Sequence, residues 1–255
     1  MIGRHPDPWL RGLLFLAALV LGDGALAQEA VTPAVTITLP AGPADEAEVA
    51  TGVQILLALT IIALAPSILI VMTSFTRIII VLSILRHAFA MQQTPPNTVL
   101  ISLALFLAAF NTMPALERAY DEAYKPYMEK EISTQEALEV GLVPFREFMV
   151  RQMREQDLAL IVELSGSDKP RSLDDVSTMQ LIPSFMLGEL KTAFQIGVII
   201  FLPFLLIDIV VASILMSMGM LMVPPMMISL PIKILMFVLI DGWYLVVESL
   251  MGSFK

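Results

Sequence analysis

Four long apolar runs constrain this sequence more than any other feature. They cover residues 52–72, residues 99–113, a stretch that ends near Met216, and residues 232–247. Soluble domains contain about 25% charged residues, but only 15% of this chain is charged and 57% of it is hydrophobic. The sequence therefore predicts an all-α, polytopic membrane protein, in which the runs form two apolar helical hairpins, at 52–113 and at 183–255.

The first 27 residues have the pattern of a cleavable secretory signal. Basic residues precede a short apolar run at 13–21, and Ala27 ends a small-x-small cleavage site that would leave Gln28 as the new N-terminus. An uncleaved anchor is the alternative, although the run is shorter than the roughly 20 residues that a spanning helix needs. Residues 28–51 are rich in Pro, Ala, Thr and acidic residues, which predicts a flexible extracytoplasmic tail.

The segment between the first two apolar runs is basic. Residues 73–98 contain Arg77 and Arg86 and no acidic residue. The positive-inside rule therefore predicts that this segment faces the cytoplasm, which agrees with an exported N-terminus. Pro95 and Pro96 are expected to end it in a turn.

Residues 114–182 differ sharply in composition from the apolar runs. They hold eight of the chain's 15 Lys and Arg residues and 14 of its 24 Asp and Glu residues, which predicts a water-exposed, helical, extracytoplasmic domain. Ser133 and Glu136 fit a capping box that begins a short helix. Pro144 suits the first turn of a second helix, and Gly166 suits a helix end. We interpret the carboxylates of this domain as solvated surface charge.

One helical face of this domain is expected to be apolar, while Glu147, Arg151 and Glu155 recur four apart on a solvated face. The expected apolar face consists of Phe145, Phe148, Met149, Met153, Leu160, Ile161 and Leu164.

Residues 217–231, between the last two apolar runs, combine helix breakers with five methionines. Gly219, Pro224, Pro225 and Pro231 work against an unbroken helix. Irregular backbone at membrane depth must be covered by protein or must line a water-filled path. Methionine is flexible and polarisable, and it adapts to shapes that are not fixed in advance. The stretch therefore indicates either a deformable constriction in a membrane assembly or, more simply, hydrophobic packing in a helical hairpin.

Charged residues also occur inside the last two apolar runs. An ionised side chain at the bilayer centre costs on the order of 3 kcal/mol on insertion scales, so such a residue normally faces protein or water. Asp208 is therefore expected to have a partner, either Lys233 or a cation of another subunit. For Lys233 and Asp241, an interfacial position with the charge reaching water is the alternative.

Other residue types restrict the function. The net charge of −9 favours neither nucleic acid nor an anionic surface as a partner. The chain has no cysteine, and we find no Ser/His/Asp set, no cluster of metal ligands and no phosphate-binding glycine loop. We therefore expect no catalytic residues, no metal site, no cofactor and no enzymatic activity.

Several motifs resemble one family in the same order, over roughly residues 52–250. The motifs are LAP at 64–66, MTSFTR at 72–77, QQTPPN at 92–97, ELKTAFQIG at 189–197, MVPP at 222–225, and PIK at 231–233 followed by DGW at 241–243. On these motifs the chain resembles the flagellar biosynthetic proteins of the FliP family, with which the SctR type of virulence secretion proteins shares its outline.

The resemblance implies a core subunit of the type III protein export gate. Members of this family join FliQ- and FliR-like subunits in a helical assembly of several copies, through which unfolded substrates pass. FlhA- and FlhB-like proteins of the export apparatus are further implied partners. The implied location is the bacterial inner membrane, at the flagellar basal body. The signal peptide favours the flagellar branch, and the SctR-type virulence branch is the alternative.

The resemblance also implies functional positions. Residues 220–222 match the methionine loop of the family, which is similar to a gasket around the closed pore. We therefore expect Met218, Met220, Leu221 and Met222 to form the constriction. Leu221 stands where the family often has a third methionine, so this sequence offers an apolar seal there rather than a sulfur atom. Independently of the resemblance, we expect charge pairs between helices, because burying an unpaired charge would be costly. The residues expected to form them are Glu189, Lys191, Asp208 and Lys233.

A secondary transporter or proton channel is the competing hypothesis, with Asp208 and Asp241 as relay groups. We find no internal repeat, although repeats are common in such folds. An Asp208→Asn variant separates the two hypotheses, because a relay loses turnover with assembly intact, whereas a structural pair loses assembly.

Overall fold

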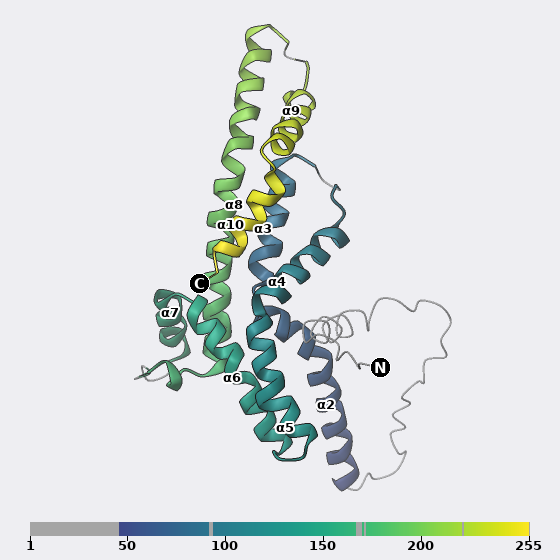
Figure 1. The fold of residues 1–255 in the computed structure, drawn as a ribbon, viewed down its shortest axis with the longest axis vertical. Helices are drawn as coiled ribbons and strands as arrows, with labels where there is room; N and C mark the ends of the chain where they lie inside the picture. The colour runs from purple at the N-terminus through teal and green to yellow at the C-terminus, as the bar shows by residue number, and fades with distance from the viewer. Residues whose placement is uncertain (1–45, 92–93, 167–169, 171, 221, 255) are drawn as a thin grey trace, which may run out of the picture. The chain divides into compact units, whose positions relative to one another are not determined.

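The structure, a computed structural model, contains only helices as regular elements in the part of the chain that it describes (Figure 1). The all-α prediction is therefore confirmed for that part. The predicted signal peptide, with Ala27 and Gln28, lies outside it. The described residues are 46–91, 94–166, 170, 172–220 and 222–254.

The chain divides into two compact units, Met1–Ile70 and Val71–Lys255. The first contains nearly all of helix α2 (Glu46–Val71), which begins six residues before the predicted apolar helix. Residues 46–51, predicted as flexible tail, are therefore helical. Ala and Glu are good helix formers, and extending an existing helix adds one hydrogen bond for each residue fixed.

The second unit is built around helix α3 (Phe75–Ala88), which packs against α4 (Asn97–Ala119) and α8 (Thr178–Ser217). Its Ile78, Val81, Leu82 and Leu85 follow helical spacing and are fully buried. This first core continues into α9 (Pro225–Leu239) and α10 (Gly242–Gly252), where Phe237 packs edge-on against Phe89. Helix α3 is thus the element that the apolar helices share.

A second core lies where α6 (Thr134–Gln152) and α7 (Glu155–Ser165) pack on the first half of α8. Phe145, Phe148 and Met149 of α6 are buried, as the spacing predicts. Beyond residue 153 the predicted apolar face is wrong, because the helix ends there and α7 begins in a new phase. Helix α7 buries Leu158 and Val162 instead of Leu160 and Leu164.

The prolines do not all act as predicted. Pro96 and Pro224 directly precede α4 and α9, and Pro225 is the first residue of α9, so both proline pairs lie where a helix begins. Pro144 lies inside α6, so the prediction that it begins a second helix is wrong. A proline inside a helix costs about 3 kcal/mol, and the burial of α6 against α4 and α8 offsets this cost. Pro231 likewise lies within α9.

The predicted helix ends at Ser133 and Gly166 are confirmed. The Ser133 hydroxyl accepts a hydrogen bond from the backbone N–H of Glu136, at 3.2 Å. The helix that it begins runs 19 residues and is not short. Gly166 follows α7 with a φ of +65°, a left-handed conformation that glycine adopts without a steric penalty.

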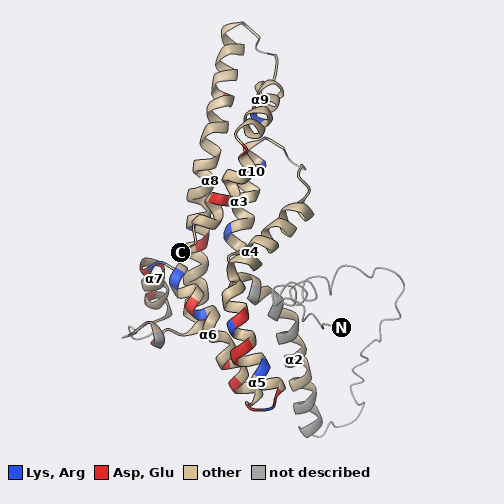
Figure 2. Ribbon diagram, in the orientation of Figure 1, with Lys and Arg blue, Asp and Glu red and all other residues tan. Residues whose placement is uncertain are grey.

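The charged segment begins inside a continuous helical stretch. Helix α4 passes directly into a π-helix (Tyr120–Tyr124) and then into α5 (Lys125–Met128), so the helical stretch extends well beyond the apolar run at 99–113. Figure 2 shows that charged residues are concentrated from the end of α4 through α7, whereas the second half of α8 and most of α9 carry almost none.

Two helical stretches of the described chain are long and apolar enough to cross a membrane, Asn97–Met128 and Thr178–Ser217. Helices α9 and α10 make a third if this pair, bent by 67°, counts as one span. The structure thus has two or three candidate spans, and the predicted arrangement of four in two hairpins stays a prediction.

Candidate functional site

The methionine-rich turn joins α8 to α9, which run side by side as a hairpin (Figure 1). Helix α8 ends at Ser217, and Gly219 then adopts a φ of +75°. The backbone N–H groups of Gly219 and Met220 donate to the carbonyls of Met216 and Leu215, so the last turn of the helix is closed by hydrogen bonds. Glycine makes this reversal possible without steric strain.

The methionine side chains of this turn point outward. Met218, Met220 and Met222 are all exposed, Met222 to 95%. Leu221, the fourth predicted constriction residue, lies outside the described residues. The 24 residues from 209 to 232 contain no Asp, Glu, Lys or Arg. The hairpin therefore ends in an uncharged apolar tip whose methionines are not covered by the described residues of the protomer.

An ion pair closes the base of this hairpin. Lys233 of α9 is 1% exposed, and its Nζ donates to Oδ2 of Asp208 on α8 at 2.6 Å. The same Nζ donates at 2.9 Å to the carbonyl of Ala88, the last residue of α3. The structure thus brings together two of the predicted charge-pair residues, and it ties both arms of the hairpin to the central helix.

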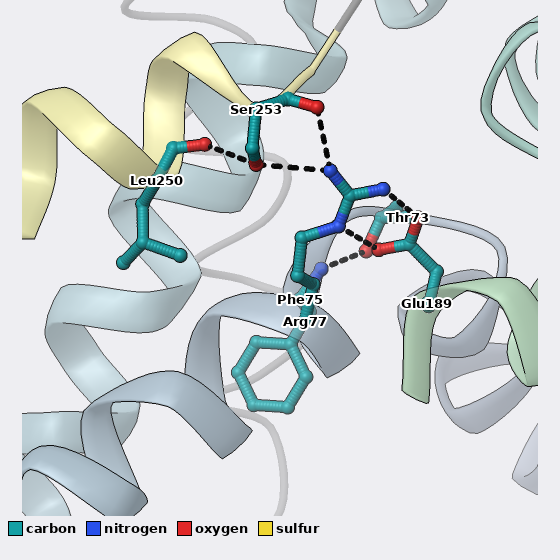
Figure 3. Close-up of polar contacts among 6 residues, drawn as sticks. All are labelled: Thr73, Phe75, Arg77, Glu189, Leu250 and Ser253. Atoms are coloured by element: carbon teal, nitrogen blue, oxygen red, sulfur yellow. Dashed lines mark hydrogen bonds and ion pairs between the residues drawn. The ribbon is translucent and has the colours of Figure 1, made fainter. Parts of the chain in front are cut away.

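A second ion pair lies deeper, between α3 and α8. Arg77 Nε donates to Oε2 of Glu189 at 2.9 Å, and Nη2 donates to Oε1 of the same carboxylate. Both side chains are almost completely buried. Figure 3 shows the guanidinium reaching the opposite way to Ser253 near the C-terminus, where Nη1 donates to both the hydroxyl and the carbonyl oxygen at 2.9 Å. The Phe254 ring covers the guanidinium, with its centroid 4.0 Å from Cζ.

Sequence reasoning missed Arg77 as the partner of Glu189. Lys191, predicted in the same set, is exposed and makes no ion pair with any residue that the structure describes. A signal for the missed pair was present: Arg77 and Glu189 each lie beside long uncharged runs. The two residues are 112 positions apart, so no spacing rule joins them.

Asp241, proposed with Asp208 as a relay group, lies in the break between α9 and α10. It is exposed, with a φ of +51°. No three His, Asp or Glu side chains of the described residues are grouped so that they could hold a metal ion.

The helices and these charges define a class: an all-helical membrane protein whose apolar hairpin is anchored by buried ion pairs and ends in an exposed methionine turn. The FliP family model matches residues 58–250. The chain belongs to the FliP family, a family of flagellar biosynthesis proteins.

Individual relatives agree with this assignment. The chain is 54% identical to the flagellar biosynthetic protein FliP of Bacillus subtilis over 210 residues, which cover 82% of this chain and 95% of that protein. It is 47% identical to the protein of the same name from Caulobacter vibrioides, over 95% of this chain and 89% of the relative. It is 53% identical to that of Pectobacterium carotovorum, over 80% and 79% of the two chains.

Proposed function

We propose that this chain is a core subunit of the flagellar type III protein export gate. In this proposal several copies join FliQ- and FliR-like subunits in the bacterial inner membrane, at the flagellar basal body, and form a gated conduit for unfolded proteins. The chain acts as a conduit rather than a catalyst, alongside FlhA- and FlhB-like proteins. The observation that carries the proposal is the uncharged tip of the α8–α9 hairpin, residues 209–232, with its exposed methionine turn.

The dimensions of the hairpin support a role inside an assembly. Helix α9 has 15 residues, or about 22 Å at 1.5 Å per residue, whereas the hydrocarbon core of a bilayer is about 30 Å thick. On its own α9 is therefore too short to cross, and the irregular backbone of the turn would need cover at membrane depth. Turns from neighbouring copies provide that cover if they meet around one axis.

The full proposed topology has four apolar segments in two hairpins, with residues 114–182 as an extracytoplasmic domain. Two observations support it: the charge is concentrated between α4 and α8 (Figure 2), and the basic segment 73–98 lies on the other side of the apolar stretch 99–113 in sequence. The virulence branch of secretion is the alternative system, and the names of the relatives favour the flagellar one.

The gasket role is tested with Met220→Ala/Met222→Ala in the complex assembled with its FliQ- and FliR-like subunits. We expect ion conductance across a planar bilayer to rise, because shorter side chains leave the constriction open. The matched control is Met226→Ala/Met227→Ala, which removes two exposed methionines from the adjacent helix. A correctly assembled Met220/Met222 variant with unchanged conductance would refute the gasket role.

A further inference from the structure

A cavity of about 270 Å³ lies in the second unit, beside the methionine hairpin but away from its tip. It opens between the end of α3, the residues that precede α4, and the break between α9 and α10. Its walls are predominantly apolar, and Phe89, Phe237, Val238 and Trp243 contribute to them. Val238 is 68% exposed, which places it at the rim.

Among the described residues, one cation and no acidic residue line this cavity. Nη1 of Arg86 donates to Oδ1 of Asn97 and, at 3.5 Å, to the carbonyl of Pro95. Its Nε is buried without a hydrogen-bond partner in the described part of the chain, and the guanidinium forms no ion pair there. The site therefore joins an apolar cavity to a positive charge that no described carboxylate balances.

This combination selects an amphiphile with an anionic head. An arginine guanidinium matches the oxygens of a phosphate, with which it forms charge-assisted hydrogen bonds. Sites for whole drug-sized ligands measure about 300–1,000 Å³, so this smaller cavity accommodates a single apolar arm. Tryptophan is enriched at membrane interfaces, and basic pockets between helices on the cytoplasmic side bind anionic phospholipid head groups. The positive-inside rule assigns the segment that carries Arg86 to that side.

We propose that this cavity binds one anionic phospholipid, with part of an acyl chain against Phe89 and Val238 and the phosphate on the guanidinium of Arg86. The lipid supplies the counter-charge that the described part of the protomer lacks. It also fills the space between the end of α3 and the break after α9.

Native mass spectrometry of the full-length protein in detergent, incubated with phosphatidylglycerol or with phosphatidylcholine, tests this proposal. We expect retention of one phosphatidylglycerol and much weaker retention of phosphatidylcholine. Arg86→Gln should lower phosphatidylglycerol retention about tenfold or more, as expected for losing hydrogen bonds to a charged group. Val238→Phe should also lower retention, because a larger side chain at the rim narrows the opening of the cavity while the charge is kept. Arg151→Gln, which removes an exposed arginine of α6, is the matched control and should retain the lipid.

Other results would contradict binding of an anionic phospholipid in this cavity. Equal retention by the wild type and Arg86→Gln, or equal binding of the two lipids, would overturn the proposal. Displacement of the lipid by inorganic phosphate alone would show that the site binds only the anion and not the acyl chain. This result would also contradict the proposal. A photo-crosslinker at position 238 of the membrane-embedded complex should capture lipid. Capture of a neighbouring polypeptide without lipid would assign the cavity to a protein contact instead.

Discussion

Lys233 and Asp208 are unequally buried, and this inequality decides which of them the fold needs more. The side chain of Lys233 is 2% exposed and that of Asp208 33% exposed. Removing the aspartate leaves a buried ammonium without its counter-charge, whereas removing the lysine leaves a carboxylate that is partly exposed on the protomer. Breaking a buried pair costs roughly 3–5 kcal/mol when the remaining charge stays buried.

Asp208→Asn is therefore expected to destabilise the detergent-solubilised protein by a few kcal/mol, and Lys233→Met by clearly less. Thermal unfolding followed by circular dichroism, with the double variant completing the cycle, measures both. Equal losses would contradict this asymmetry. An Asp208→Asn protein that assembles normally but loses transport would instead support the proton-relay hypothesis.

Arg77 uses its whole guanidinium, so lysine is not an equivalent residue at this position. Its nitrogens bond both carboxylate oxygens of Glu189 and two oxygen atoms of Ser253. A lysine supplies one point charge and loses the planar fork.

We expect Arg77→Lys to lower the free energy of unfolding by about 1.5–3 kcal/mol, the range for hydrogen bonds to charged groups. Arg118→Lys, at an exposed ion pair with Glu122 and Glu147, is the matched control and should cost clearly less, because solvent screens exposed ion pairs. Denaturation of the two variants under the same conditions compares them directly. A similar cost for both would show that burial adds nothing to the Arg77 pair.

These residues show what can be inferred from sequence at this scale. Asp208 and Lys233 each interrupt an apolar run. Because an unpaired charge there is costly, the sequence predicts Lys233 as a candidate partner of Asp208. Arg77 lies at the edge of its run and could be explained by cytoplasmic exposure. Only the folded chain, which places the C-terminal Ser253 and Phe254 over α3, makes its burial visible.

At the scale of elements, the close packing of α3 on α8 depends on Gly197. A Cβ at this position would overlap Cδ1 of Ile84 and lie 3.1 Å from its Cγ2. A side chain at position 197 would therefore force Ile84 out of its present conformation or push the two helices apart.

We predict that Gly197→Ala destabilises the protein by about 1–3 kcal/mol, the usual cost of overpacking a core. Ile84→Val removes the overlapping Cδ1 and should recover most of this loss in the double variant. The unfolding free energies of the two single variants and the double variant provide the test. Additive losses would show that the two positions do not meet.

Helix α6 is tied to α4 by an exposed ion pair between Glu147 and Arg118. The hydrogen bond from Arg118 lowers the pKa of the Glu147 carboxyl. Because the folded pKa lies below the unfolded value of about 4.3, the contribution to stability is present above that value and is lost as the pH falls through the folded pKa. Both side chains are nearly half exposed, so the contribution stays below about 1 kcal/mol.

The wild type should lose stability as the pH falls below about 4.3. Glu147→Gln should make this loss smaller and should have little effect at neutral pH. Thermal unfolding as a function of pH measures this difference. Glu139→Gln, which removes another exposed carboxylate of α6, is the control and should lose stability at low pH as the wild type does. The same loss in the Glu147 variant would contradict a role of the Glu147–Arg118 ion pair in it.

Helix boundaries were predictable where the signal is local and wrong where packing overrides it. Ser133 and Gly166 act through hydrogen bonds and backbone freedom within their own turn. Pro144 disfavours a helix interior locally, yet α6 continues through it because Phe145, Phe148 and Met149 are buried on the same helix. No local rule predicts the helix break at Met153, so the apolar face predicted from the sequence continues past this residue.

At the scale of the whole molecule, the order of motifs allowed the family to be recognised before the fold was known. The arrangement of the spans was less predictable, because hydropathy does not separate a helix that crosses the membrane from an apolar hairpin covered by protein. Helices α9 and α10 illustrate this: the apolar run at 232–247 is bent by 67° at its break. The assembly proposed here depends on contacts between chains, which one protomer does not contain.

The most direct test of this assembly uses the absence of cysteine from the sequence. Met222→Cys gives a single thiol at the tip of the turn, and Met179→Cys gives one at the other end of α8, where Met179 is 84% exposed. Both variants are expressed with the FliQ- and FliR-like subunits, oxidised in the membrane, and analysed by non-reducing electrophoresis. If the turns of several copies meet at one constriction, Met222→Cys should form disulfide-linked dimers of this chain and Met179→Cys should not. An assembled Met222→Cys complex that stays monomeric after oxidation, or equal dimer formation at both positions, would contradict the shared constriction.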